Sequence, residues 1–347
     1  MSSSVLHAFA FGIATKNSQG DVIEVYYPEP LINPDSDYAD AVLNVIEFNE
    51  YNNGFAELNS EIVAQLAGAL EVLGFTSQSQ LVEQLSAGSL TVIACALFTD
   101  SKPASVPEAY LKLHLLSHRH AKPHELNLDG IFGVLPNLAW TNQGAISLND
   151  LPARQLAARL EGQVLEVMSI DKFPKMTNYV VPSGVRIAHT ARVRLGAYLG
   201  EGTTIMHEGF VNFNAGTDGP AMIEGRISAG VMVGENSDLG GGCSTMGTLS
   251  GGGTEVISVG KNCLIGANAG IGFPLADGCI VEAGLYVTAG TKVNVLTSSG
   301  TLEGSVKARE LSATPDRLFR RNSLSGAVEC VPLKSAVTLN EELHSHN

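Results

Sequence analysis

The clearest pattern in the 347-residue chain is a six-residue repeat of hydrophobic and small residues that begins near residue 187. In five consecutive hexads the first position is aliphatic and the fifth is small. The first positions are Ile187, Val193, Leu199, Ile205 and Val211, and the fifth are Ala191, Ala197, Thr203, Gly209 and Ala215. Such a repeat gives one short strand and one turn, with the aliphatic residue pointing inward and the small residue at a crowded corner. It is typical of a parallel β-helix, whose coils bury one another's faces.

The register shifts and then resumes to about residue 297, with further aliphatic first positions at Val233, Leu239, Val259, Ile265, Val281 and Val287. We expect the breaks, around 217–220 and 245–255, to bulge out as loops. Three hexads make a coil of eighteen residues, so about 110 residues predict about six coils. A β-sandwich is disfavoured, because its strands would alternate with a period of two at longer spacing.

The first 179 residues have a different pattern. Strands are predicted at 22–26 and 90–98, and helices at 60–73 (ended by Gly74), 80–85, 108–120 and 151–160, the last with Asn149 or Asp150 as N-cap. The pattern divides the chain into an α/β domain (1–105), a helical connecting region (106–179), the β-helix (180–300) and a short C-terminal segment (301–347). In the third predicted helix, His114, His118 and His120 are candidate metal ligands. A surface or interface helix without a metal is favoured, since no H-E-x-x-H motif accompanies them.

Composition adds limits on function. The chain has 21 Lys and Arg against 35 Asp and Glu, a net charge of −14, and only 6% aromatic residues, so nucleic-acid binding is disfavoured. It has no run of about 18 apolar residues and no signal-peptide pattern, so no membrane span or secretion is expected. Five loosely spaced cysteines predict free thiols in a reducing cytoplasm.

Longer motifs lie within and around the repeat. They are Asp171-K-F-P-K-M, Val185-R-I-A through Arg192-V-R-L-G-A, Met206-H-E-G-F-V-N-F-N-A-G, Glu224-G-R-I-S-A-G, Gly240-G-G-C-S-T-M-G-T-L-S-G-G-G and Leu318-F-R-R-N-S. Together they resemble the longer bacterial form of tetrahydrodipicolinate N-succinyltransferase, a family of hexapeptide-repeat acyltransferases. The resemblance is close from about residue 105 to the end and loose before it.

The resemblance implies a left-handed parallel β-helix and a homotrimer with each active site between neighbouring β-helices. It also implies transfer of succinyl from the co-substrate succinyl-CoA to the amino group of ring-opened tetrahydrodipicolinate, in the succinylase branch of lysine and diaminopimelate synthesis. The products would be N-succinyl-2-amino-6-oxopimelate and CoA. No redox or prosthetic cofactor is implied.

Site residues follow from the same resemblance. Glu224 corresponds to the catalytic residue, and a carboxylate there can act as a covalent nucleophile or as a general base; the sequence leaves both roles open. Arg226 offers a planar fork for a succinyl carboxylate. The remaining succinyl-CoA contacts map onto Gly241, Ser244, Ala267, Glu282, Ala283, Gly290, Lys307, Arg320, Arg321, Asn322 and Ser323.

Relatives also place a magnesium ion on the trimer axis, bound by a Glu and an Asp. Glu208 corresponds to the Glu, but Ala191 stands at the Asp position. One carboxylate per chain is a weaker site for a hard cation, but three symmetry copies of Glu208 could still bind one ion.

Three other functions compete with the succinyltransferase. A β-helix carbonic anhydrase needs three converging histidines, and the repeat holds only His189 and His207. An acetyltransferase with another amine or hydroxyl acceptor would use His207 as its base. A non-catalytic solenoid scaffold would not require the basic run from Lys307 to Arg321. The motifs around Glu224 favour the succinyltransferase over all three.

Overall fold

The computed structural model describes residues 6–48, 52–247 and 256–333, which form two compact units. The first contains residues 6–121 and 125–174, and the second contains residues 122–124 and 175–333 in the described ranges. None of the helices in these ranges combines the length and apolar character that crossing a bilayer requires.

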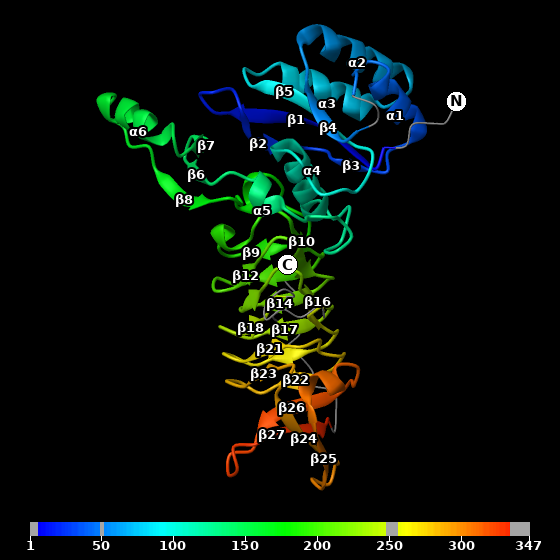
Figure 1. Ribbon diagram of the computed structural model, residues 1–347, viewed down its shortest axis with the longest axis vertical. Helices are drawn as coiled ribbons and strands as arrows, with labels where there is room; N and C mark the ends of the chain where they lie inside the picture. The colour runs from blue at the N-terminus through cyan, green and yellow to red at the C-terminus, as the bar shows by residue number, and fades with distance from the viewer. Residues whose placement is uncertain (1–5, 49–51, 248–255, 334–347) are drawn as a thin grey trace. The chain divides into compact units, whose positions relative to one another are not determined.

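The first unit is built on an antiparallel sheet in the order β2-β1-β5-β4, with β3 paired to β1. Its strands are β1 (Ala8–Lys16), β2 (Val22–Tyr26), β3 (Leu31–Ile32), β4 (Gly54–Glu57) and β5 (Thr91–Leu97). On one face lie α1 (Ser36–Leu43), α2 (Ser60–Val72) and α3 (Thr76–Ser86), whose apolar residues form one core with Phe9 and Phe11 of the sheet. Against β2 and β5 lies α4 (Val106–Ser117) (Figure 1).

Most elements predicted for this unit are confirmed, and α2 ends at Val72 before Gly74, whose φ of +83° suits glycine. The helix expected at 80–85 is longer, because α3 begins at Thr76. The surface interpretation of the 108–120 helix is wrong: every residue of α4 from Pro107 to Ser117 is buried.

The pattern also missed a small sheet in the order β7-β6-β8. It is formed by β6 (Leu138–Thr141), β7 (Gly144–Ser147) and β8 (Val167–Asp171), with α5 (Ile131–Val134) before it and α6 (Leu151–Leu160) between β7 and β8. All of β6 is buried, so its sequence, L-A-W-T, carries no alternation.

The second unit is a parallel β-helix with three walls (Figure 1). The first wall contains β9 (Arg186–Ile187), β11 (Thr203–Ile205), β14 (Ala221–Ile223), β17 (Ser237–Leu239), β20 (Leu264–Ile265) and β22 (Ile280–Val281). The second contains β12 (Phe210–Val211), β15 (Arg226–Ile227), β18 (Ser244–Thr245), β21 (Gly270–Gly272) and β23 (Tyr286–Thr288). The third contains β10 (Ala197–Leu199), β13 (Ala215–Thr217), β16 (Met232–Val233) and β19 (Ser258–Val259). The six strands of the first wall agree with the expected number of coils.

Not every coil has eighteen residues: one is shorter and one is longer. Ile187 pairs with Ile205, eighteen residues on, but Ile223 pairs with Leu239, sixteen residues on. The expected bulge at 217–220 is wrong, because β13 and β14 flank an ordinary corner there. The apparent break arises because the inward residue is Thr217, fully buried, and because the coil is two residues short after Ile223.

The second expected break, at 245–255, falls mostly on 248–255, outside the described residues. The strands on either side give its size: Val233 pairs with Val259, an offset of 26 residues and eight more than a regular coil.

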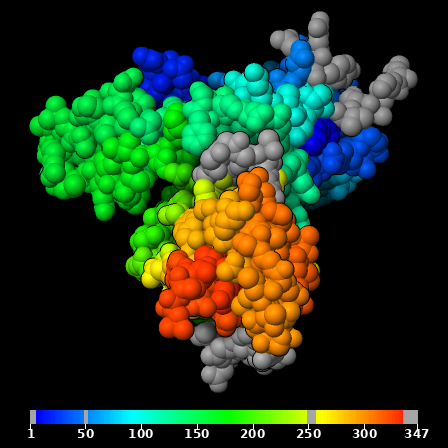
Figure 2. Space-filling model, turned by 60° about the horizontal axis from the view of Figure 1, so that its bottom comes forward, coloured from blue at the N-terminus to red at the C-terminus, as the bar shows by residue number. Residues whose placement is uncertain are grey.

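Four strands close the C-terminal end: β24 (Lys292–Leu296), β25 (Leu302–Lys307), β26 (Arg317–Arg321) and β27 (Val328–Pro332). Because β26 pairs in parallel with β22, the end strands continue the first wall. They gather into one continuous surface, orange to red in Figure 2.

Candidate active site at one corner of the β-helix

Successive coils turn from the first wall to the second at one corner, and equivalent residues lie above one another. The first residue of each turn is Glu224, Gly240, Gly266 and Glu282. Each backbone N–H donates to the carbonyl of the last inward residue one coil further on, at 2.8–2.9 Å. The corner is therefore a straight column held by main-chain hydrogen bonds.

Small residues in this column are required by the close approach of the coils. A Cβ on Gly240 would lie 2.8 Å from the backbone nitrogen of Ala267, and one on Gly266 would lie 2.5 Å from that of Ala283. Ala267 and Ala283 themselves are exposed. The structure thus brings three of the predicted contacts, Gly241, Ala267 and Ala283, together in a strip that is nearly free of side chains.

Glu224 lies at one end of this strip. Its side chain is half-buried, and its carboxylate has no hydrogen bond or ion pair to any residue within the described ranges. A Cβ on Gly241 would lie 3.4 Å from Oε2 of Glu224, so the carboxylate lies against the strip. The corner is two residues shorter here, and it turns through Gly225, where a Cβ would lie 2.2 Å from Sγ of Cys243. A half-buried carboxylate without a cation partner can accept a proton from a substrate.

The second wall presents a polar row beside this carboxylate. Arg226 pairs with Ser244, and its guanidinium donates to Oγ of Ser244 at 2.6 Å. Tyr286, two coils below Ser244, extends over Gly270, where a Cβ would lie 2.3 Å from the ring, and its hydroxyl is 3.3 Å from the same Oγ. Sequence reasoning missed Tyr286; its only signal is that Gly270 leaves room for a large neighbour.

The other end of the strip meets the C-terminal strands. Glu282 accepts a hydrogen bond from the backbone N–H of Arg321 at 2.7 Å. Arg320 and Asn322 both donate to Glu329, at 3.0 and 2.7 Å, and these bonds hold the pKa of the Glu329 carboxyl below its usual value. Arg320 is thus partly neutralised, whereas the predicted contact Ser323 is exposed next to this network.

Two predicted contacts lie elsewhere. Gly290 follows β23 and lies at the far edge of the second wall. Lys307 is near it, because the next residue, Ala308, donates its N–H to the carbonyl of Thr291 at 2.9 Å. Both are exposed, but the structure does not bring them to the Glu224 corner of the same chain.

The predicted metal ligand Glu208 is already bonded. Its carboxylate lies 3.0 Å from Nδ1 of His207 and 3.1 Å from the Arg192 guanidinium, and these contacts lower its pKa, that with His207 most. Ala191 contributes no oxygen ligand from its side chain. No group of three His, Cys, Asp or Glu able to hold a metal occurs in the described ranges. The residues of a single chain therefore do not fit a magnesium site.

The histidines have other surroundings. His189 and His207 lie on successive coils, with ring centroids 5.2 Å apart. In the first unit, His114 is fully buried, with Nδ1 2.7 Å from the carbonyl of Tyr110 and Nε2 accepting from the N–H of Tyr27 at 3.2 Å. Since both ring nitrogens are occupied, His114 has a structural role. The five cysteines are free, as predicted, and all are buried.

Comparisons with known proteins cover nearly the whole chain. Models of the N-terminal and middle regions of tetrahydrodipicolinate N-succinyltransferase match residues 70–133 and 135–175, and a hexapeptide-repeat model of succinyltransferases matches 256–289. A 2,3,4,5-tetrahydropyridine-2,6-dicarboxylate N-succinyltransferase of Pseudomonas paraeruginosa is 61% identical over 345 residues, 99% of this chain and 100% of the relative. One from Vibrio cholerae is 53% identical over 98% of this chain and 99% of its own length.

A solved structure extends the comparison to the fold. The crystal structure of a proposed 2,3,4,5-tetrahydropyridine-2-carboxylate N-succinyltransferase from Campylobacter jejuni has a TM-score of 0.88 and 32% identity. The match covers 96% of this chain and 94% of that one. The identity over the full length and the shared architecture show that the chain belongs to the tetrahydrodipicolinate N-succinyltransferase family.

Proposed function

We propose that this protein transfers the succinyl group of succinyl-CoA to the amino group of ring-opened tetrahydrodipicolinate. The products are N-succinyl-2-amino-6-oxopimelate and CoA, in the succinylase branch of lysine and diaminopimelate synthesis. The observation that carries the proposal is the Glu224 carboxylate, which has no partner among the described residues and lies at the end of the nearly side-chain-free strip, two residues before Arg226. The relatives' names supply the acceptor and the succinyl group.

Glu224 acts as the general base in this proposal. The acceptor nitrogen attacks the thioester carbonyl carbon, so that a C–N bond forms and the C–S bond breaks. Glu224 accepts the proton that the amine loses, and the CoA thiolate leaves. A base in this position typically contributes about 10²–10⁴-fold to the rate. An acyl-anhydride on Glu224 is the alternative, and mass spectrometry of enzyme quenched with succinyl-CoA alone would detect it.

Arg226 binds the free carboxylate of the succinyl group. Its bond to Ser244 uses one of its five N–H donors and orients the fork, and the others are available to a carboxylate. The rest of succinyl-CoA follows the strip past Gly241, Ala267 and Ala283 toward Glu282, Arg321, Asn322 and Ser323.

The position of Gly290 and Lys307 supports an assembly. They lie at the far edge of the wall from Glu224, so a donor that touches both sets would bridge two chains. A homotrimer of left-handed β-helices, with each site between neighbours and the phosphates of CoA on Lys307, is therefore part of the proposal.

A reducing cytoplasm is also part of the proposal, supported by the five free cysteines. A magnesium ion on a trimer axis would have one Glu208 from each chain, and the bonds of Glu208 to Arg192 and His207 oppose it. The proposed mechanism uses no metal.

The second candidate is an acetyltransferase with another acceptor. One observation favours it: His207 lies at the same corner as Glu224, one coil earlier, because the N–H of Met206 bonds the carbonyl of Ile223. Its link to Glu208 would suit a base. Variant His207→Ala tests this role.

Thiol release measured with succinyl-CoA or acetyl-CoA, and with 2-aminopimelate as a stable acceptor mimic, tests the proposal. We expect acceptor-dependent release that is faster with the succinyl donor. No acceptor-dependent release with either donor would refute the transferase function, whereas preference for acetyl-CoA would refute only the donor.

A further inference from the structure

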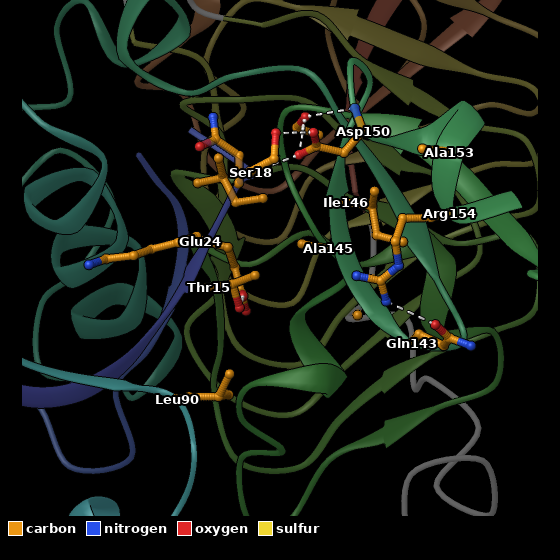
Figure 3. A pocket seen from close by; sticks show the side chains of 15 residues that line it. Thr15, Ser18, Glu24, Leu90, Gln143, Ala145, Ile146, Asp150, Ala153 and Arg154 are labelled. Atoms are coloured by element: carbon orange, nitrogen blue, oxygen red, sulfur yellow. Dashed lines mark hydrogen bonds between the residues drawn. The ribbon is translucent and has the colours of Figure 1, made fainter. Parts of the chain in front are cut away.

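The first unit contains a cavity that shares no residue with the candidate active site. Its volume is about 730 Å³, within the range of small-molecule sites. One side is formed by the β1–β2 hairpin and the other by β7 and α6, with Leu90 at the edge (Figure 3).

The strand β7 lies at the edge of its sheet, and its unpaired edge, with backbone N–H and C=O groups, faces this cavity. Thr141 and Gly144 close the β6–β7 hairpin with two residues between them, so the next pair, Trp140 and Ala145, is a non-hydrogen-bonded one. The N–H and C=O of Ala145 therefore point away from β6, toward the open edge. Ala145 is 8% exposed, and no protein partner for these two groups occurs in the described part of the chain. A buried main-chain donor and acceptor normally find partners.

Side chains of both charges line the same space. Arg154 of α6 donates one hydrogen bond, to Gln143 at 3.1 Å, and keeps further N–H donors. Across the cavity, the Glu24 carboxylate accepts from the hydroxyl of Thr15 at 2.5 Å. Figure 3 shows these two pairs on separate sides of the cavity.

Further contacts hold the walls in place. Asp150 accepts hydrogen bonds from the backbone N–H and the hydroxyl of Ser18 and from the hydroxyl of Ser147. These bonds lower the pKa of the Asp150 carboxyl, those from Ser18 most, so it stays ionised at neutral pH. Lys16 is held by Glu57 at 2.6 Å. The apolar lining is aliphatic: Ile23, Leu90, Ala145 and Ile146.

We propose that this cavity binds a free α-amino acid with an aliphatic side chain. The ligand carboxylate accepts from the N–H of Ala145 and from Arg154, and its ammonium donates to the C=O of Ala145. The side chain covers Ile23 and Leu90. A zwitterion matches this arrangement because its two charged groups are spaced to meet the donor and acceptor of one strand residue. The site is independent of the transferase proposal.

Calorimetric titration of the full-length protein with L-leucine as probe tests the inference. We expect a dissociation constant on the order of 0.1–1 mM, reasonable for so small a ligand. 4-Methylpentanoate lacks the amine and isoamylamine lacks the carboxylate, so each should bind at least about tenfold more weakly, the loss of one charged contact. No binding of leucine at several times that concentration, or equal binding of either analogue, overturns the proposal.

Variants locate the site. Arg154→Gln should weaken leucine binding at least about tenfold, whereas Arg159→Gln, on the same helix but outside the cavity lining, should not. Ala153→Phe should block the cavity, with Ala157→Phe as the matched control. Circular dichroism melts confirm folding of each. Unchanged binding in Arg154→Gln and Ala153→Phe, or an equal loss in the controls, places leucine elsewhere and refutes the assignment.

Discussion

Each of the two units of this chain is stabilised internally by a different kind of packing. The first buries bulky side chains between helices and a sheet, as in the edge-on contacts of Phe9 with Phe11 and Tyr38, at centroid distances of 4.9 and 5.7 Å. The β-helix stacks short coils whose inward residues are mainly aliphatic and whose backbone N–H groups bond the next coil. The glycines are concentrated in the β-helix: 25 of the 37 lie in residues 180–300.

The difference shows where each unit can carry chemistry. In the first unit, His114 is enclosed in the core and both of its ring nitrogens have partners. In the β-helix the interior is filled, so the corners and outer walls remain for substrates, and close packing removes side chains from one corner. Charge follows the same division, with −11 in residues 1–179, −3 in 180–300 and 0 in 301–347. Most of the acidity therefore belongs to residues outside the β-helix, the unit that holds the proposed site for an anionic donor.

The largest expected effect is on catalysis at the β-helix corner. Glu224→Gln should lower kcat by about 10²–10⁴-fold, because the amide cannot accept the proton of the amine. Steady-state thiol release measures it, and an unchanged melting temperature shows that the fold is intact. Glu235→Gln, which alters an exposed carboxylate paired with Lys261, is the control and should retain full activity. If Glu224→Gln keeps more than about a tenth of the rate, the base lies elsewhere.

The second prediction tests how tightly the coils are packed. A Cβ on Gly216 would lie 1.7 Å from the carbonyl oxygen of Tyr198, so the backbone must move in Gly216→Ala. We expect the β-helix to lose about 2–4 kcal/mol, measured by calorimetric unfolding. In the first unit, Gly133 has open space around its Cβ position, and Gly133→Ala should be nearly neutral. Equal effects of the two would show that the close approach of the coils at Gly216 does not control the stability of the β-helix.

The third prediction is that acid lowers the stability of the first unit more than that of the β-helix. Burial lowers the pKa of His114 to about 3 and that of His118 to about 4, below the ordinary 6.5. Because the unfolded chain then binds protons more readily than the folded one, stability is present above pH 6.5 and is lost as the pH falls toward 3–4. The fully buried His114 contributes about 1.4 kcal/mol for each pH unit in this window.

Hydrogen exchange at pH 7, 5.5 and 4.5 measures this loss. We expect β1, β2 and α4 to lose protection before the walls of the β-helix. Earlier loss in the β-helix, or simultaneous loss in both units, would show that these histidines do not control acid stability.

The smallest effect concerns donor binding. Ser244→Ala removes the acceptor of the 2.6 Å bond from Arg226 and frees the guanidinium to rotate. The KM for succinyl-CoA should rise about fivefold, the value of one hydrogen bond, with kcat nearly constant. Arg226→Lys, which loses the bidentate fork, should raise KM further. A fall in kcat with unchanged KM in Ser244→Ala would place this row in the chemical step.

The sequence predicted the repeat well because one inward position per hexad is constrained by the neighbouring coils. It misplaced the break at 217–220, since Thr217 interrupts the aliphatic column although it points inward. The strand β6 was missed because a strand buried on both faces has no alternation.

The candidate site was reached through motif resemblance and not through periodicity. Outward positions such as Tyr286 are not constrained by the stack, so the repeat says nothing about them. Folding then shows what spacing cannot: Gly241, Ala267 and Ala283 share one column, whereas Gly290 and Lys307 lie across the wall.

The shortened corner at Glu224 has an evolutionary consequence. Strand pairs on both sides of it, Ile223 with Leu239 and Arg226 with Ser244, remain in register although two residues are missing. The same holds where eight residues are added before Val259. Insertions and deletions at corners thus leave the walls of the β-helix unchanged. They change only the position of a reactive corner side chain on its surface. We expect acceptor preference in such solenoids to diverge through corner length, while their walls stay nearly constant.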